Sequence, residues 1–378
     1  MMMKKLISAA VERGSESIHI KAGDVFRARI HGELVKLSDE PFTPEDTRRI
    51  AMDLLPTDAL RERIDEIMDY DFAWELEGVA RFRVNVLRQR GTFMVVMRVI
   101  PWKVPSFEDL GLPLSLAEIA KQPDGLVLVT GATGVGKSTT QAAMIDWINR
   151  NLQKHIITLE DPIEYWHDNV ASTVTQREIE RDTESFRSGL RSALRQDPDV
   201  ILIGEMRDTE TFEIGFEASE TGHLVISTMH SPTAVGTITH VLAMFPDQKE
   251  ILVRRRLADT LRAIISQRLV SKLDGGRVPV MEVLIGTAAV RDSILQGEVQ
   301  QSIMRLIQEG SGYGMQTFDQ HLMQLVKEGV VTFDDAKAAA TSPADFELIL
   351  QTLAQEDEEA AEEQAVGDEF VSRDFFPE

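Results

Sequence analysis

The sequence predicts an α/β protein in which a smaller α+β unit precedes a larger domain built on a parallel sheet. In the first hundred residues, short runs alternate apolar and polar side chains, as strands with one covered face do. From about residue 126 the apolar runs are continuous and helical segments separate them, which indicates strands covered on both faces. A stretch containing three prolines lies between the two patterns and marks the boundary.

Length and composition favour a folded protein of two to three domains. The chain has 378 residues, of which 43% are apolar and 27% charged, so most of it can build hydrophobic cores. The formal net charge is −22, and residues 355–378 alone carry ten acidic side chains and one arginine. Because binding to a phosphate backbone draws on clustered lysine and arginine, this acidic balance argues against a nucleic-acid partner.

Several protein classes are excluded by what the sequence lacks. It has no cysteine, which removes disulfides, cysteine-based zinc sites and a cysteine nucleophile. No apolar run approaches the roughly 20 residues of a membrane span. The basic start, Met1–Glu12, lacks the apolar core of a signal peptide. We therefore expect a cytoplasmic protein.

The first unit, residues 1–100, is predicted to be a β-meander on one or two helices. A strand over Val25–Ile30 turns at His31-Gly32 into Leu34–Leu37, and apolar positions between Ile50 and Met68 recur at helical spacing. Three further strands are predicted, at Asp71–Leu76, Ala80–Leu87 and Thr92–Ile100.

The linker and the second domain are predicted at residues 101–113 and 114–353. Pro101, Pro105 and Pro113 cannot donate to a β-ladder, which favours a connection. Helices are expected at Ser185–Arg195 and Thr209–Glu220, then over a region from Gln248 to Val270 and onward to about residue 353, and residues 354–378 form an acidic tail expected to be disordered. The strands expected in this domain are Leu126–Val129, Ile156–Leu159, Val200–Ile203 and Leu224–Ile226.

A phosphate-binding loop follows the first of these strands. The stretch matches the pattern G-x-x-x-x-G-K-[ST] in full, and a helix is expected directly after it. Its glycines let main-chain N–H groups curl around phosphate oxygens, Lys137 would reach the β- and γ-phosphates, and Ser138 would ligate Mg²⁺. A glycine-rich turn with a surface lysine is the alternative. The residues predicted to bind ATP here are Gly131, Ala132, Thr133, Gly134, Val135, Gly136, Lys137, Ser138 and Thr139.

Two carboxylate sites follow two other strands. Val200–Ile203 ends at Gly204-Glu205, and because nucleotides bind at the carboxyl edge of such a sheet, Glu205 is a candidate to hold a metal-bound water. Glu160, Asp161 and Glu164 cluster around Pro162, and Glu164 is the candidate base for an attacking water. The alternative for each is an ordinary exposed acid in a turn.

Histidines and arginines supply the remaining candidates. His223 and His230 flank one strand and would sense the γ-phosphate, although an isolated histidine is more often structural. Charge on the transferred phosphoryl group calls for a further cation. Arginines lie along the strands of the first unit, where alternation puts Arg81 and Arg83 on one face, while the turn before the next strand leaves the face of Arg98 open. A basic solvent face is the alternative.

The order of these motifs resembles the secretion-type hexameric ATPases, specifically the PilT/PilU retraction motors of type IV pili. The similarity covers residues 1 to about 353. In that family the corresponding segments are the Walker A loop, the Asp box, an atypical Walker B motif ending in glutamate, and the His box. The segments that carry it are Gly131–Ser138, Glu160–Glu164, Asp197–Arg207, Thr221–His230 and Gly314–Gln320.

The resemblance implies a PAS-like N-terminal domain and a RecA-like ATPase domain, assembled as a homohexamer. It implies Glu164 as general base and Glu205 as the residue that positions metal and water. Arg83 and Arg98 would be cationic contacts to the nucleotide. ATP and Mg²⁺ are the implied cofactors, and an inner-membrane platform protein at the pilus base is the implied partner.

The absence of cysteine and the start at the PAS-like unit favour the retraction branch, which serves twitching motility. Val174–Glu178 and Thr183–Phe186 are similar to PilU, which leaves two roles open. The chain is expected to be the retraction motor itself or an accessory nucleotide-binding subunit of a second retraction ATPase. A nucleic-acid translocase is a third reading, since RecA-like domains also drive helicases.

Overall fold

The computed structural model describes residues 2–30, 32–100, 103–349 and 352, so the predicted acidic tail lies outside the described residues. The chain forms two compact units. The first comprises residues 1–105 and 145–204, and the second comprises residues 106–144 and 205–378. Within the described part of the chain, no helix combines the length and the apolar character needed to cross a membrane.

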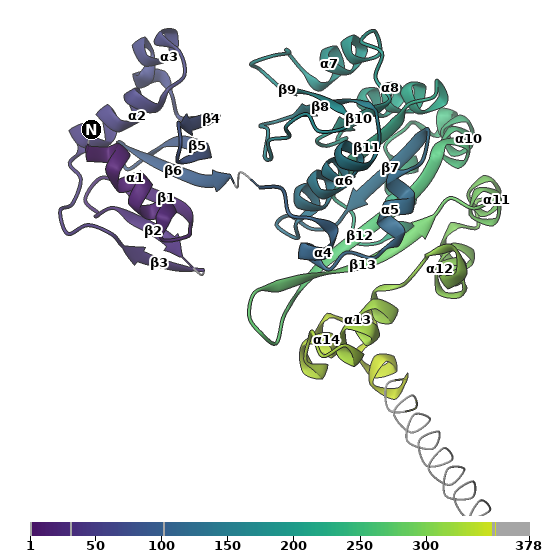
Figure 1. Cartoon of the computed structure of the whole chain (residues 1–378). Helices are drawn as coiled ribbons and strands as arrows, with labels where there is room; N and C mark the ends of the chain where they lie inside the picture. Colours follow the sequence, from purple (N-terminus) through teal and green to yellow (C-terminus); the bar gives the residue numbers. More distant parts are fainter. Residues whose placement is uncertain (1, 31, 101–102, 350–351, 353–378) are drawn as a thin grey trace, which may run out of the picture. The chain divides into compact units, whose positions relative to one another are not determined.

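An antiparallel sheet of six strands forms the first part of the first unit (Figure 1). Its strand order is β3-β2-β1-β6-β5-β4, and α1 packs on β1 while α2 packs on β6. Phe26, Phe82 and Met97 are fully buried in the core beneath these helices. The elements are α1 (Met2–Glu12), β1 (Ser15–Lys21), β2 (Arg27–Ile30), β3 (Glu33–Lys36), α2 (Pro44–Leu54), α3 (Asp58–Glu62), β4 (Asp69–Leu76), β5 (Ala80–Gln89) and β6 (Thr92–Ile100).

The predicted meander is confirmed for β4, β5 and β6, and β2 and β3 pair as the predicted hairpin, but β1 lies between these two groups in the sheet. Alternation works here because one face of each strand is covered: in β5, Phe82, Val84 and Val86 are buried while the residues between them point the other way. Helix α1 and strand β1 were not predicted. Helical spacing of Leu6 and Ala10 is the signal that would have found α1.

A second sheet has seven strands. In the first unit β8 pairs in parallel with both β9 and β10, and in the second unit β7 pairs in parallel with β11 and β12. Every residue of β7, β10 and β11 is buried, which confirms the prediction of strands covered on both faces. The strands are β7 (Gly125–Thr130), β8 (His155–Glu160), β9 (Thr173–Glu178), β10 (Val200–Ile203), β11 (Leu224–Met229), β12 (Leu261–Ser271) and β13 (Arg277–Ile285).

The helical region predicted from Gln248 to Val270 is wrong over its second half. Helix α10 (Glu250–Thr260) ends at Thr260, and the chain continues as β12, which pairs with β7 on one side and with β13 on the other. Figure 1 shows β12 and β13 as a long hairpin. Leucine and isoleucine at positions such as 257, 261, 264 and 265 fit a helical period as well as a buried strand, so pairing decides between them.

Helices complete both units. The predicted linker, residues 101–113, contains α4. Phe107 and Leu112 of this stretch are buried. Near the C-terminal end of the described chain, Phe318, Leu322 and Phe346 pack with Val278 and Val280 of β13. The helices are α4 (Phe107–Leu110), α5 (Ser115–Ala120), α6 (Lys137–Asn151), α7 (Phe186–Ala193), α8 (Thr209–Glu220), α9 (Ala234–Ala243), α10, α11 (Ala288–Gln296), α12 (Val299–Glu309), α13 (Phe318–Lys327) and α14 (Phe333–Ala339).

Candidate nucleotide-binding and catalytic site

The phosphate-binding loop connects the end of β7 to the start of α6, as predicted. Gly131, Gly134 and Gly136 all have positive φ, at 146°, 81° and 88°. A side chain on Gly131 would place Cβ 2.6 Å from the main-chain oxygen of Gln267, so the tight curl of the loop requires glycine there. Ala132, Thr133 and Gly134 form its exposed crest.

Lys137 lies at the first turn of α6 with only 9% of its surface exposed. Its ammonium group donates to the carbonyls of Gly131 and Ala132 at 2.9 and 3.0 Å, so the charge stays over its own loop. The same nitrogen lies 3.4 Å from Nδ1 of His230. Lys137 is therefore held at the loop. Its ammonium group can exchange these carbonyls for phosphate oxygens without a large movement of the side chain.

Glu205 and His230 meet at the ends of β10 and β11. Nε2 of His230 lies 3.1 Å from one carboxylate oxygen of Glu205, and Arg207 contacts the other at 2.6 Å. Because His230 also reaches Lys137, one imidazole joins three predicted motifs: the loop lysine, the strand-end glutamate and the histidine after β11. The second unit thus brings Lys137, Glu205 and His230 together at the phosphate-binding loop.

The predicted Mg²⁺ ligands are Ser138 and Glu205. A hydroxyl and a carboxylate are the hard oxygen donors that Mg²⁺ takes, and this ion completes its shell with waters and substrate phosphates. Both oxygens of Glu205 already have partners in His230 and Arg207, which favours holding the ion through water. Among the described residues, no group of three or more His, Asp or Glu side chains forms a metal cage. The chemistry of these two donors fits a nucleotide-bound Mg²⁺.

The Asp-box loop, residues 160–164, follows β8 in the first unit and is held by side chains of β9. Gln176 Nε2 donates to Glu160 at 3.2 Å and to the carbonyl of Tyr165 at 2.8 Å. Glu178 accepts from the main-chain N–H of Ile163 at 3.3 Å. Glu164, the predicted base, is 40% exposed and its side chain lies 3.8 Å from Arg83. Main-chain anchoring therefore fixes this loop while leaving the Glu164 carboxylate accessible.

Glu160 differs from its neighbour Glu164. Burial raises the pKa of the Glu160 carboxyl to about 7, and the nearby charge of Glu164 acts in the same direction. Hydrogen bonds from Thr158 and Gln176 favour the ionised form and limit the rise. Of the three carboxylates in this cluster, Glu160 is the one whose pKa burial raises, whereas Asp161 and the Glu164 side chain are exposed, and Glu164 remains the candidate base.

Arg83 and Arg98 are directly opposite each other on β5 and β6. Residues paired in this way point to the same side of a sheet, so the two predicted cations share one face. Arg98 is exposed, and Arg83 lies within ion-pair distance of Asp71 and Glu164. The register settles the orientation of Arg98, which alternation along the sequence left open.

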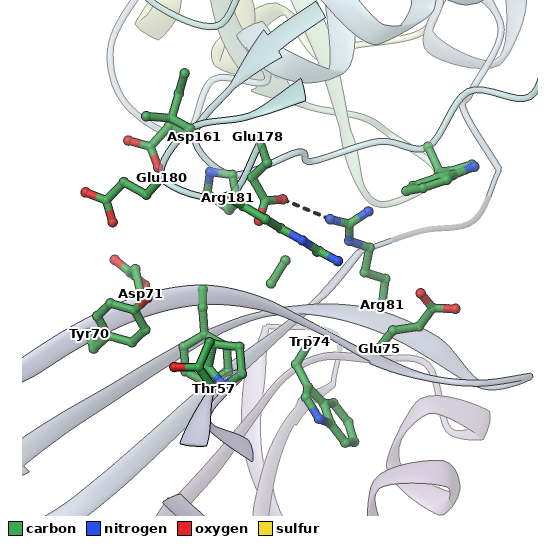
Figure 2. A pocket seen from close by; sticks show the side chains of 16 residues that line it. Thr57, Tyr70, Asp71, Trp74, Glu75, Arg81, Asp161, Glu178, Glu180 and Arg181 are labelled. Atoms are coloured by element: carbon green, nitrogen blue, oxygen red, sulfur yellow. Dashed lines mark hydrogen bonds and ion pairs between the residues drawn. The ribbon is translucent and has the colours of Figure 1, made fainter. Parts of the chain in front are cut away.

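Arg81 has a different environment from Arg83. Figure 2 shows its guanidinium pointing to Glu178, and the two form an ion pair of 2.9 Å with both side chains 7% exposed. The guanidinium also lies over the ring of Trp166. This pair lines a cavity of about 540 Å³ in the first unit, which Tyr70 and Trp74 of β4 border as well. Arg81 is therefore committed to a buried pair.

His223 lies at the other end of β11 from His230. Its Nδ1 is 2.9 Å from the carbonyl of Ala218, and its own carbonyl accepts from Gly125, the first residue of β7. The phosphate loop follows the opposite end of β7, roughly 20 Å away for a strand of this length. The structure thus places His223 at the far edge from Lys137, and its nucleotide contact stays a prediction.

Sequence reasoning missed Gln176, Glu178 and Gln267. Gln176 and Glu178 hold the Asp-box loop, and Gln267 contacts the phosphate-binding loop. The signal for Gln267 was present: a polar amide within the apolar run that begins at Leu261. A buried amide needs hydrogen-bond partners, which marks such a residue for attention.

Comparisons with known proteins agree with this geometry. A family model described as type II/IV secretion system protein matches residues 1–276. The type IV pilus retraction ATPase PilT of Pseudomonas aeruginosa is 41% identical over 346 residues, covering 92% of this chain and all of PilT. The type IV pilus ATPase PilU of the same organism is 39% identical, covering 94% of this chain and 93% of PilU.

A crystal structure of the pilus retraction motor PilT with bound ADP has the same fold. Its TM-score is 0.83 at 44% identity, and the match covers 91% of this chain and 98% of that one. This similarity confirms the predicted fold class, a RecA-like P-loop ATPase domain preceded by a smaller α+β PAS-like domain. The chain belongs to the family of type II/IV secretion system proteins, and its relatives named above are ATPases.

Proposed function

We propose that this chain is a motor ATPase that couples ATP hydrolysis to type IV pilus retraction and so to twitching motility. The observation that carries the proposal is the contact of His230 with both Lys137 and Glu205, which joins three motifs at one phosphate site. Relatives at 39 to 41% identity are named as type IV pilus ATPases, and for this reason we propose that the motor acts on a pilus.

In the proposed mechanism, main-chain N–H groups of residues 131–136 cradle the phosphates and Lys137 moves from its loop carbonyls onto the β- and γ-phosphate oxygens. Ser138 and Glu205 would hold Mg²⁺, which would supply positive charge to offset the charge that develops on the phosphates. Glu164 accepts a proton from the attacking water. His230 lies between Lys137 and Glu205 and registers the loss of the γ-phosphate through both.

Arg83 and Arg98 act at a neighbouring copy in this proposal. Their shared, accessible face suits contact with phosphate oxygens, which arginine binds through its planar fork. The chain would assemble as a homohexamer, with nucleotide held between protomers, and act on the cytoplasmic side of the inner membrane. An inner-membrane platform protein at the pilus base would be its partner, and the acidic composition argues against nucleic acid.

The decisive variant is Lys137→Ala. The methyl group of alanine cannot donate to the phosphates or offset their charge as the ammonium group does. We therefore expect ATP turnover and pilus retraction to be lost. The variant should keep the mass of the assembled ring, which native mass measurement checks. Normal hydrolysis in this variant contradicts the proposal, and stimulation of hydrolysis by single-stranded DNA at moderate salt would favour a translocase instead.

An accessory role is the second candidate. The chain is nearly as similar to PilU as to PilT, at 39% and 41% identity, so similarity does not separate a principal motor from a partner subunit. Deleting the gene for this chain distinguishes them. A principal motor predicts complete loss of retraction, whereas an accessory subunit of a second retraction ATPase predicts residual retraction.

A further inference from the structure

Gln267 is a polar residue in the middle of an apolar strand. It lies on β12 beyond Ile264 and Ile265, and 3% of its surface is exposed. Burying a primary amide without partners is costly, so its contacts must satisfy both ends. Those contacts all lie on the phosphate-binding loop and the helix that follows it.

The side-chain amide spans the loop and the helix. Its Nε2 donates to the main-chain oxygen of Val135 at 2.5 Å, and its Oε1 accepts from the hydroxyl of Thr140 at 2.7 Å. A main-chain oxygen can only accept, so the NH₂ end must face Val135 and the amide has one possible orientation. Gln267 therefore ties the loop to the first turns of α6.

The main chain of β12 supports the same loop. Ser266 is the register partner of Thr130, the last residue of β7, and their hydroxyls are 2.9 Å apart. A Cβ on Gly131 would lie 2.6 Å from the carbonyl oxygen of Gln267, and one on Gly136 would lie 3.1 Å from its Nε2. Gln267 thus lies against both ends of the glycine-rich loop.

Holding the Val135 carbonyl has a consequence for phosphate binding. In a planar trans peptide, the C=O of one residue and the N–H of the next point in opposite directions. Fixing the Val135 carbonyl on Gln267 therefore directs the Gly136 N–H away from β12. An amide directed in this way is free to bind an anion, whereas a peptide free to rotate would lose part of that preorganisation.

We propose that Gln267 is a positioning residue that clamps the phosphate-binding loop in its nucleotide-binding shape through Val135 and Thr140. The inference rests on the proposed function, because it concerns binding of nucleotide at this loop. Gln267 acts through the loop main chain, so its loss should weaken nucleotide binding more than it slows the chemical step.

The test measures affinity for a fluorescent ADP analogue, together with KM and kcat for ATP and the thermal midpoint, on the full chain. Gln267→Leu removes both hydrogen bonds, and Gln267→Glu keeps the acceptor for Thr140 but sets an oxygen against the Val135 carbonyl. We expect each to raise Kd and KM by about tenfold, with a smaller change in kcat, since in both variants the Val135 carbonyl loses its hydrogen-bond donor.

Thr140 provides a second, independent pair of variants. Thr140→Val removes one end of the clamp and should raise Kd a few-fold, whereas Thr140→Ser keeps the hydroxyl and should restore the parent affinity. Combined with Gln267→Leu, Thr140→Val should add little, because both changes break the same connection. This pair also tests the inference if Gln267→Leu fails to fold.

The matched control is Gln316→Leu. Gln316 likewise donates its amide to a main-chain oxygen, that of Met281 on β13 at 3.0 Å. It should shift the thermal midpoint and leave Kd unchanged. Parent-like Kd in both Gln267 variants overturns the clamp, as does a lowered thermal midpoint with unchanged Kd. Additive effects of Thr140→Val and Gln267→Leu on Kd would also overturn the clamp, and would favour direct contact of these side chains with the nucleotide. Failure of the unaltered chain to bind ADP would instead contradict the proposed function.

Discussion

Glu205 and Glu164 are both carboxylates at strand ends, yet the chain holds them in different ways. The Glu205 side chain is 17% exposed and contacts His230 and Arg207 through its two oxygens. The Glu164 side chain is 40% exposed, and its carboxylate has Arg83 at the longer distance of 3.8 Å. Glu205 is fixed by side chains, whereas Glu164 is positioned through the main chain of its loop.

The difference fits two kinds of work. A group that positions a metal-bound water must not move, and direct contacts to its carboxylate supply that rigidity. A base must gain a proton and reach water, which favours exposure and a weak partner. Gln176 and Glu178 hold the loop of Glu164 by its backbone, so its carboxylate can move without loss of the loop.

The largest effect is expected from Glu164→Gln. An amide of the same shape cannot take a proton, so kcat should fall by roughly a thousandfold, within the range for loss of general base catalysis. Affinity for ADP should stay within about twofold of the parent. Steady-state ATPase assays with equilibrium binding measure both. The control Glu184→Gln changes an exposed acid of the same unit and should leave kcat unchanged. A parent-like kcat for Glu164→Gln would show that Glu164 is not the base, and the proposed difference in role between Glu164 and Glu205 would be wrong.

Glu160→Gln tests whether burial separates Glu160 from Glu164. Glu160 has a folded-state pKa of about 7 against an ordinary value of 4.5. Between these values the unfolded chain ionises first, so stability of the parent falls as pH rises from 4.5 through 7 and the loss is complete above 7. The variant does not ionise, and its advantage should grow to about 3 kcal/mol above pH 7.

Denaturant unfolding at pH 4.5 and pH 8 measures this difference for Glu160→Gln. The variant and the parent should be close in stability at the lower pH. Glu184→Gln again serves as the exposed control and should show no such dependence. An equal effect of Glu160→Gln at both pH values would show that Glu160 titrates like an exposed acid.

His230→Ala tests the side-chain contacts that fix Glu205. Removing the imidazole breaks the 3.1 Å contact to Glu205 and the 3.4 Å contact to Lys137, so kcat should fall about tenfold while the fold persists. His240→Ala, on the exposed side of α9, is the matched control. An unchanged kcat in His230→Ala would mean that Glu205 is held without the histidine.

The smallest effect is expected from Arg83→Gln on stability. Its ion pairs to Asp71 and Glu164 are 3.6 and 3.8 Å long between partly exposed groups, so they contribute less than about 1 kcal/mol. Thermal melting should match that of Arg63→Gln, which removes an exposed pair with Glu66. A loss of several kcal/mol in Arg83→Gln would show that Glu164 is fixed as firmly as Glu205.

Local patterns predicted the elements that depend on neighbours in the sequence. The phosphate loop between β7 and α6 was predicted because glycine spacing and a following helix are local properties, and the meander of β4 to β6 was predicted because each turn lies between its own strands. Strand β12 was missed because its pairing with β7 joins residues more than 130 positions apart. An apolar run cannot by itself distinguish a helix from a buried strand.

By itself the sequence determined the residue types of the site: the glycine-rich loop with Lys137 and Ser138, and acids after two buried strands. Only the tertiary structure decided which of them meet. It set His230 between Lys137 and Glu205, gave Glu160 and Glu164 unequal burial, and put Gln267 against the loop. Motifs are short and follow local rules, whereas contacts and burial depend on how distant strands pair and pack.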